Sequence, residues 1–424
     1  MEATTSLTTT TPEAQIGLRL LALILALAGL GLSPNGQARA QAGVQVTASP
    51  SPEYTFGKIL TFRISADSDA SITSVTLLYR VWQATGTVSA PAAFTPSREV
   101  AATYTLDLTA YALVPFTRMD YWWEIRDEAN RQLTTETQTF RYIDNRFDWQ
   151  TLSQAPLAVH WYTGGRAFGQ DALTLAAAAL TRANRALQAT LPESIDIYIY
   201  ADDTDVQGAL KPAERLWAEG RVDPALNLVI LSAAPGLEAE PNLERELPHE
   251  LTHLLIYQLV GPQYAQVPNW LNEGLAVMNQ TRPDPGFSKT LTAARDSGKL
   301  LSLTSLCGPF PADPAQAQLA YAESESVVRY LRDRYADAGI SKLLAAYTAA
   351  GATCESGLEH GLNNLTLADL EKASLRNTAD TAGNRTDSGL AAQRMPWVIL
   401  SAVILVAGGL ITLLTLGSQK PPRP

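Results

Sequence analysis

The sequence has little cysteine, little histidine and no excess of positive charge. Its 424 residues include two cysteines and four histidines, and the formal net charge is −10. That negative charge argues against nucleic acid as a partner. No basic run with interleaved aromatic residues offers a groove for phosphates, and no glycine-rich phosphate loop follows a plausible strand. We therefore expect no nucleic-acid partner.

Two of the few histidines stand in one pentapeptide, His249-Glu250-Leu251-Thr252-His253. Residues four apart share a helix face, so the two imidazoles would lie side by side and suit two corners of a tetrahedral zinc site, with Glu250 close to a metal-bound water. Glu273, in Pro268-Asn269-Trp270-Leu271-Asn272-Glu273-Gly274, would add a third ligand and leave the fourth position open, as in catalytic zinc sites. The alternative is a helix whose histidines are satisfied without a metal.

These residues resemble the gluzincin metallopeptidases, and most closely the peptidase MA-like group. In that clan a glutamate on a second helix completes the site, and here nineteen residues separate His253 from Glu273. Residues 270–276 are also similar to the third-ligand helix of M1 aminopeptidases, where the gap is one residue shorter. The resemblance extends from about Phe147 to about Ala373. It assigns one Zn²⁺ and four roles: His249, His253 and Glu273 as metal ligands, and Glu250 as general base.

Two departures from the family pattern affect this interpretation. Pro248 directly precedes the first histidine, so the metal helix is expected either to start there or to kink. The Gly-x-Met-Glu-Asn segment with which M1 enzymes grip a free amino terminus is missing, so an aminopeptidase is not indicated, and endo- and exopeptidase activities both stay open. In gluzincins a tyrosine or histidine after the third ligand often stabilises the oxyanion. Tyr321 is therefore a candidate for this role, with core packing as the alternative, whereas His160 and His360 are expected to be surface or core residues.

The two ends of the chain indicate export and a membrane anchor. Residues 1–42 are expected to form a polar start and a signal peptide, with an apolar run over 18–32 and an A-x-A site at 40–42. An uncleaved anchor is the alternative. Residues 396–418 are predicted to form a transmembrane helix, because 397–416 carry no charge over about the length that spans a bilayer. Lys420 and Arg423 then place the tail, 419–424, in the cytoplasm. We expect a single-pass protein of the cell membrane with its catalytic domain on the extracytoplasmic side, and the lipid bilayer as a partner of the C-terminal helix.

Between these ends, the sequence predicts an all-β sandwich followed by an α+β zincin-like metallopeptidase domain. Residues 43–145 contain short alternating runs rich in β-branched and aromatic residues, such as 59–64, 75–81 and 120–125, which favour a sandwich of immunoglobulin or fibronectin type III character. Such a module spaces, docks or binds a protein or surface ligand. Residues 146–376 change to helices alternating with strands, and a polar linker is expected at 377–395.

Within the predicted metallopeptidase domain, Leu228, Val229 and Ile230 are the candidate edge strand that pairs with an extended substrate, with an ordinary core strand as the alternative. Cys307 and Cys354 lie in the same domain. An exported chain with an even cysteine count favours a disulfide between them, and two buried thiols are the alternative.

Three functional hypotheses follow. The favoured one is a membrane-anchored zinc metallopeptidase that cleaves peptide or protein substrates with a zinc-activated water and Glu250 as the base. The others are a catalytically silent surface binding protein on the same fold, and a metal-dependent hydrolase of non-peptide substrates. Because the ligand and base positions are all occupied by suitable residues, the sequence gives no support to a silent site.

Overall fold

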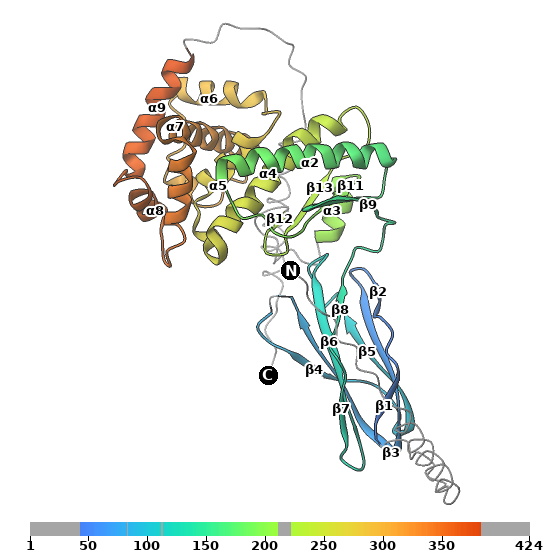
Figure 1. Cartoon of the computed structure of the whole chain (residues 1–424). Coiled ribbons are helices and arrows are strands. Elements are labelled where there is room, and N and C mark those ends of the chain that lie inside the picture. The colour runs from blue at the N-terminus through green and yellow to red at the C-terminus, as the bar shows by residue number, and fades with distance from the viewer. Residues whose placement is uncertain (1–42, 83, 112, 211–221, 383–424) are drawn as a thin grey trace, which may run out of the picture.

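A β-rich domain is followed by a mixed sheet and a helical region in this computed structural model, which describes residues 43–82, 84–111, 113–210 and 222–382 (Figure 1). The predicted signal segment, transmembrane helix and tail lie outside the described residues. Within the described part of the chain, no helix combines the length and apolar character needed to cross a membrane. The predicted order, β-rich domain first and zincin-like domain second, is confirmed.

The β-rich domain is built around one long strand, β3 (Ile59–Val81). The first half of β3 pairs with β5 and the second half with β6, both antiparallel, and shorter strands complete an eight-stranded sheet. Phe62 from the first half lies 5.1 Å from Tyr121 of β6 between ring centroids, so the buried faces of the two halves meet. The other strands are β1 (Gln45–Ala48), β2 (Glu53–Thr55), β4 (Val88–Pro91), β5 (Ser97–Asp107), β6 (Arg118–Asp127), β7 (Gln132–Thr134) and β8 (Gln138–Arg141).

The continuity of β3 corrects one prediction, because 59–64 and 75–81 were expected to be separate strands. The polar residues between them suggested a turn, but they are satisfied within the sheet. Ser68 donates a hydrogen bond to Asp127 (2.9 Å), which also accepts one from Arg131 (2.9 Å). Since these buried polar groups have partners, the chain can continue in the strand across a register shift instead of leaving the sheet.

A second sheet supports the metal helix. Its order is β12-β13-β11-β10-β9, with three parallel central strands and antiparallel strands at both edges. Helices α2 and α4 cover one face (Figure 1). The elements are β9 (Gln150–Gln154), β10 (Leu157–Trp161), α2 (Arg166–Leu187), β11 (Ile195–Tyr200), α3 (Asp203–Leu210), β12 (Val222–Asp223), β13 (Leu228–Ser232) and α4 (Ala239–Val260).

The other face of this sheet packs against the β-rich domain. Tyr198 and Tyr200 of β11 belong to the same apolar cluster as the β-rich domain, and Tyr198 stacks on Phe116 with ring centroids 3.5 Å apart. Arg141 of β8 also forms an ion pair with Asp196 of β11 (2.7 Å). The two regions therefore share one core across the predicted boundary at residue 145.

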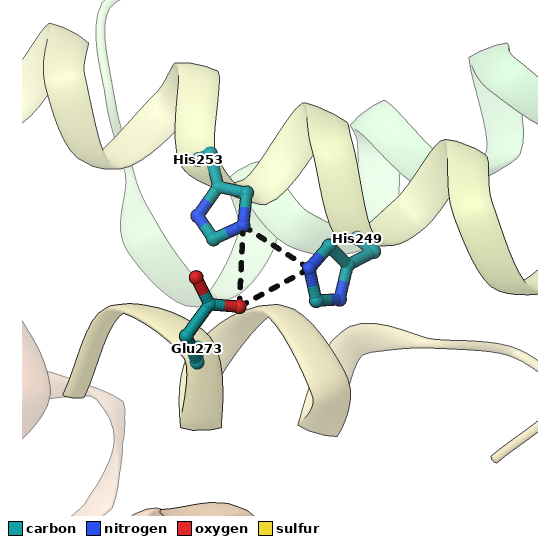
Figure 2. A group of neighbouring side chains, drawn as sticks. All are labelled: His249, His253 and Glu273. Carbon is teal, nitrogen blue, oxygen red and sulfur yellow. Dashed lines mark hydrogen bonds and ion pairs between the residues drawn. The ribbon is translucent and has the colours of Figure 1, made fainter. Parts of the chain in front are cut away.

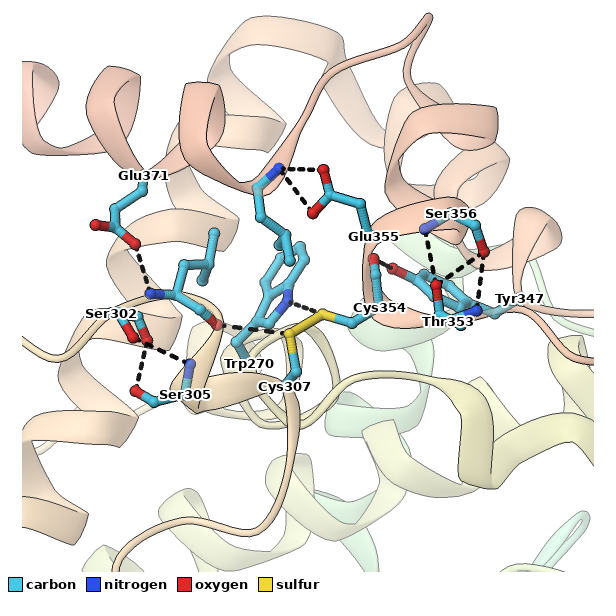
Figure 3. The surroundings of a disulfide bond; sticks show 12 residues. Trp270, Ser302, Ser305, Cys307, Tyr347, Thr353, Cys354, Glu355, Ser356 and Glu371 are labelled. Atoms are coloured by element: carbon cyan, nitrogen blue, oxygen red, sulfur yellow. Dashed lines mark hydrogen bonds between the residues drawn. A yellow bond between two sulfur atoms is a disulfide. The ribbon is translucent and has the colours of Figure 1, made fainter.

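A helical region follows α4 and packs against it. It contains a short 3-10 helix (Gly261–Gln266), α5 (Asn269–Asn279), α6 (Gly286–Asp296), a second 3-10 helix (Ser305–Cys307), α7 (Pro314–Ala346), α8 (Cys354–Gly361) and α9 (Leu367–Ala382). The predicted disulfide between Cys307 and Cys354 is confirmed (Figure 3). Helix α9 continues through Ala382, so the first residues of the predicted linker are helical and that boundary was placed too early.

Candidate metal centre

Helix α4 carries the histidine pair through the middle of the domain. Its apolar residues Leu247, Leu251, Leu254 and Leu255 are fully buried, which fixes the helix between the sheet and the helical region. Pro248 lies near its midpoint, so the helix neither starts at the proline nor ends there. In a regular helix the N–H of residue 248 would donate to the Glu244 carbonyl, but proline has no N–H. This carbonyl instead accepts a hydrogen bond from the Thr281 N–H (3.0 Å).

Helix α5 brings Glu273 to the histidines. The residue after it is Gly274, where an added Cβ would lie 2.5 Å from the backbone oxygen of Ser324 in α7. Only glycine therefore allows α5 to pack this closely on α7. Figure 2 shows the Glu273 carboxylate pointing from α5 toward the two imidazoles of α4.

The three side chains form the one His, Cys, Asp or Glu group with metal-ligand spacing found among the described residues. The His249 and His253 Nε2 atoms are 3.1 Å apart, and Glu273 Oε2 lies 3.3 Å from the former and 3.6 Å from the latter. Tetrahedral ligands at about 2.0–2.1 Å from zinc lie roughly 3.3–3.4 Å from one another. The donor set and its spacing thus fit a three-ligand zinc site.

Neutral amides hold the outer nitrogens of both imidazoles. Asn272 Oδ1 lies 3.0 Å from His253 Nδ1, and the Asn272 amide donates to the Tyr264 hydroxyl (2.9 Å). The Gln280 amide lies 3.3 Å from His249 Nδ1. With both Nδ1 atoms engaged, the Nε2 atoms converge on the carboxylate, which is the arrangement that a metal requires.

The charges of the metal-free site are strongly coupled. Burial opposes a charge on His249, but its hydrogen bond to Glu273 and the carboxylate charge outweigh burial and raise the pKa of His249 to about 9. Burial, helped by the neighbouring His249, lowers the pKa of His253. The pKa of Glu273 lies below its usual value, because the two imidazoles outweigh the effect of burial. The metal-free His249 therefore carries an additional ring proton at neutral pH, which a divalent metal ion bound at the centre would displace.

The other predicted site residues fall into two groups. Glu250 is buried on α4 beside His249, and the Tyr321 ring of α7 lies 6.4 Å from the His249 ring between centroids, so both lie beside the metal centre. Leu228, Val229 and Ile230 are fully buried in β13, and β12 pairs with the first two, so the prediction of an edge strand was wrong. An apolar run signals burial, but it cannot reveal that two further residues, Val222 and Asp223, add an outer strand.

The remaining histidines stay outside the metal centre. His160 on β10 contacts Asp196 (2.9 Å) and Thr151 (2.9 Å), and His360 is exposed at the end of α8. Sequence reasoning missed Gln280 as a contact of His249. The sequence signal was spacing: Gln280 lies seven residues after Glu273, which is about two helical turns, so both residues lie on the same side of α5.

Comparisons with known proteins agree with this geometry. The family profile of the peptidase MA superfamily matches residues 175–377. The chain carries a peptidase MA superfamily domain. It is therefore a zinc metallopeptidase of that superfamily, as predicted, and peptides are the substrates that the family implies.

Similarity to individual proteins is low. No curated protein sequence matches the chain. An M1 zinc metallopeptidase from Deinococcus radiodurans is similar at 14% identity over 84% of this chain and 97% of that chain, with a TM-score of 0.33. A family 56 carbohydrate-binding module, a β-1,3-glucan binding domain, is similar at 14% identity over 24% of this chain and 100% of its own length, with a TM-score of 0.16. Such values are too low to assign a substrate or a ligand.

Proposed function

We propose that the protein is a membrane-anchored peptidase whose zinc site hydrolyses peptide bonds outside the cytoplasm. The disulfide between Cys307 and Cys354 supports an oxidising compartment. The apolar runs at 18–32 and 397–416 support export and a C-terminal anchor.

The residues around the metal centre have complementary roles. When bound by His249, His253 and Glu273, zinc supplies a Lewis acid and lowers the pKa of water toward about 7. Glu250 accepts the proton of the attacking water on its carboxylate and passes it to the leaving amine. The Tyr321 hydroxyl donates a hydrogen bond to the oxyanion that forms on the substrate carbonyl.

The single observation that carries this function is the convergence of the three ligand atoms at tetrahedral spacing. It is tested with the full-length chain in detergent, alongside Glu250→Gln and Glu273→Ala. Wild type and Glu250→Gln should each bind about one zinc, whereas Glu273→Ala should bind it much more weakly. Only wild type should cleave peptide libraries or casein at full rate, with Glu250→Gln slower by about 10²–10⁴-fold.

Each alternative has its own outcome. A wild type that takes up no zinc would refute the metal centre itself. Zinc binding without peptide cleavage would favour a silent binding protein or a hydrolase of non-peptide substrates. Tyr321→Phe separates the oxyanion role from core packing, because it should slow turnover by about 10²–10³-fold while zinc content stays the same.

A further inference from the structure

Three consecutive residues at the C-terminal end of α5 all bond to the metal helix: Asn279, which is the last residue of α5, and Gln280 and Thr281, which follow it. We call them the α5 clasp. The Asn279 amide donates to the Pro248 carbonyl (3.3 Å) and to the Thr252 hydroxyl (2.8 Å) of α4. The clasp therefore contacts α4 on both sides of His249.

The proline before the first ligand makes room for this contact. Because Pro248 has no N–H, the Glu244 carbonyl lacks its regular helical donor four residues on and can accept the Thr281 N–H at 3.0 Å. A proline inside a helix normally destabilises it. Here the freed carbonyl instead joins α4 to the helix that carries Glu273.

The clasp is fixed from its outer side by α2. Arg182 donates hydrogen bonds to the Asn279 side chain (3.2 Å), to the Asn279 backbone carbonyl and to the Thr281 hydroxyl (3.0 Å). Gln280 lies between these two anchored residues. Its side chain is consequently held next to His249 with little freedom to move away.

The chemistry of His249 defines what Gln280 must provide. If Nε2 of a neutral imidazole is to bind a metal, the ring proton must sit on Nδ1, and Nδ1–H then needs an acceptor. Gln280 Oε1 is buried and has no hydrogen-bond partner among the described residues, while the amide nitrogen faces Nδ1. The two amide atoms are interchangeable in shape, and turning the amide over gives Oε1 the Nδ1–H as its donor.

We infer that Gln280 is a positioning residue that holds His249 in its metal-binding tautomer and orientation, and that Pro248 allows the clasp that places it there. This inference rests on the proposed function of His249 as a zinc ligand. Gln280 would do for His249 what Asn272 does for His253. Both ligands would then be supported by neutral amides.

The test measures zinc affinity, by chelator competition, for full-length protein freed of metal. Gln280→Met keeps the length of the side chain but removes the acceptor, and should weaken zinc binding by about 10–100-fold. Gln280→Glu keeps an acceptor oxygen and should bind zinc within about 3-fold of wild type or more tightly. Gln258→Met is the matched control, because Gln258 is a half-buried α4 residue whose amide bonds Asn227 instead (3.0 Å), and it should leave zinc affinity unchanged.

Nitrogen NMR of the His249 ring in zinc-loaded wild type gives a second readout that needs no variant. The inference expects Nδ1 to carry the proton, and a ring protonated on Nε2 would overturn it. Wild-type zinc affinity in Gln280→Met, or an equal loss in Gln258→Met, would do the same. If wild type cleaves peptides normally, either of those results would refute the positioning role of Gln280 and leave the proposed function standing. If Gln280→Met binds zinc more weakly but wild type cleaves no peptide, the positioning role would be supported and the peptidase function refuted.

Discussion

Removing the disulfide tests how the helical region is held together. Cys307 and Cys354 are 47 residues apart, and a cross-link over such a loop lowers the chain entropy of the unfolded state by an amount equivalent to about 4 kcal/mol. The double change Cys307→Ser with Cys354→Ser removes the bond, yet the new hydroxyl at position 354 can still accept from the Trp270 indole N–H, which now contacts Cys354 Sγ at 3.4 Å (Figure 3). We therefore expect the free energy of unfolding to fall by about 4 kcal/mol.

The assay is urea unfolding without reductant, with wild type in excess dithiothreitol as the control. Reductant should shift wild type to the value of the double variant and leave the variant unchanged. Zinc affinity of the folded protein should stay within about 3-fold of wild type, since packing between α4, α5 and α7 fixes Glu273. A loss of stability below about 1 kcal/mol would refute the entropic argument, and a parallel loss of zinc affinity would show that the bond acts on α5 in the native state.

Three further predictions concern charge and packing. Because Glu273 outweighs burial and raises the pKa of His249 to about 9, zinc binding at pH 7 should release about one proton, which calorimetry in two buffers measures. The same pKa shift stabilises the metal-free protein fully below about pH 6.5, and that stabilisation is lost as the pH rises through about 9. Burial raises the pKa of Glu323 to about 7, opposed by the hydrogen bond from the Leu301 N–H and helped by the charge of Glu371, so ionising this carboxyl between about pH 4.5 and 7 destabilises the fold. Glu323→Gln should therefore be more stable than wild type by about 1–2 kcal/mol at pH 8, after allowing for solvent screening, and equally stable at pH 4.5 in urea unfolding. Phe116→Ala should lower stability by about 3–5 kcal/mol and speed proteolysis near residue 146, with zinc affinity unchanged.

The metal centre was largely predictable because its chemistry is local. The i, i+4 histidines depend only on helix geometry, and Glu273 lies on the next helix along the chain. The role of Pro248 was not predictable in the same way. A proline in a helix sequence indicates a start or a kink, and only the position of Thr281 in space shows where the freed Glu244 carbonyl finds a donor.

Strand pairing was less predictable, since it depends on residues far apart in sequence. The prediction of a strand at 228–230 is confirmed. Its apolar pattern does not state which strand lies outermost, and the pairing of β12 decides that. The polar stretch inside β3 resembles a turn until Asp127 and Arg131 are brought to Ser68 by the fold.

The shared core decides whether the peptidase domain can exist without the β-rich domain. Tyr198, Tyr200, Leu228 and Ile230 lie on the face of the second sheet opposite α2 and α4, and all are at most 2% exposed in a cluster with the β-rich domain. Part of this cover comes from the peptidase domain itself, since α3 packs on β11 and β13 and the Trp149 ring lies 5.0 Å from the rings of Tyr198 and Tyr200 between centroids. The rest comes from the β-rich domain, whose Phe116 stacks on Tyr198. Uncovering a large buried side chain costs about 1.5–3 kcal/mol, against a typical domain stability of about 5–15 kcal/mol. The β-rich domain therefore helps to stabilise the sheet that supports the metal helix, and any ligand-binding role of its outer surface is additional to this structural one.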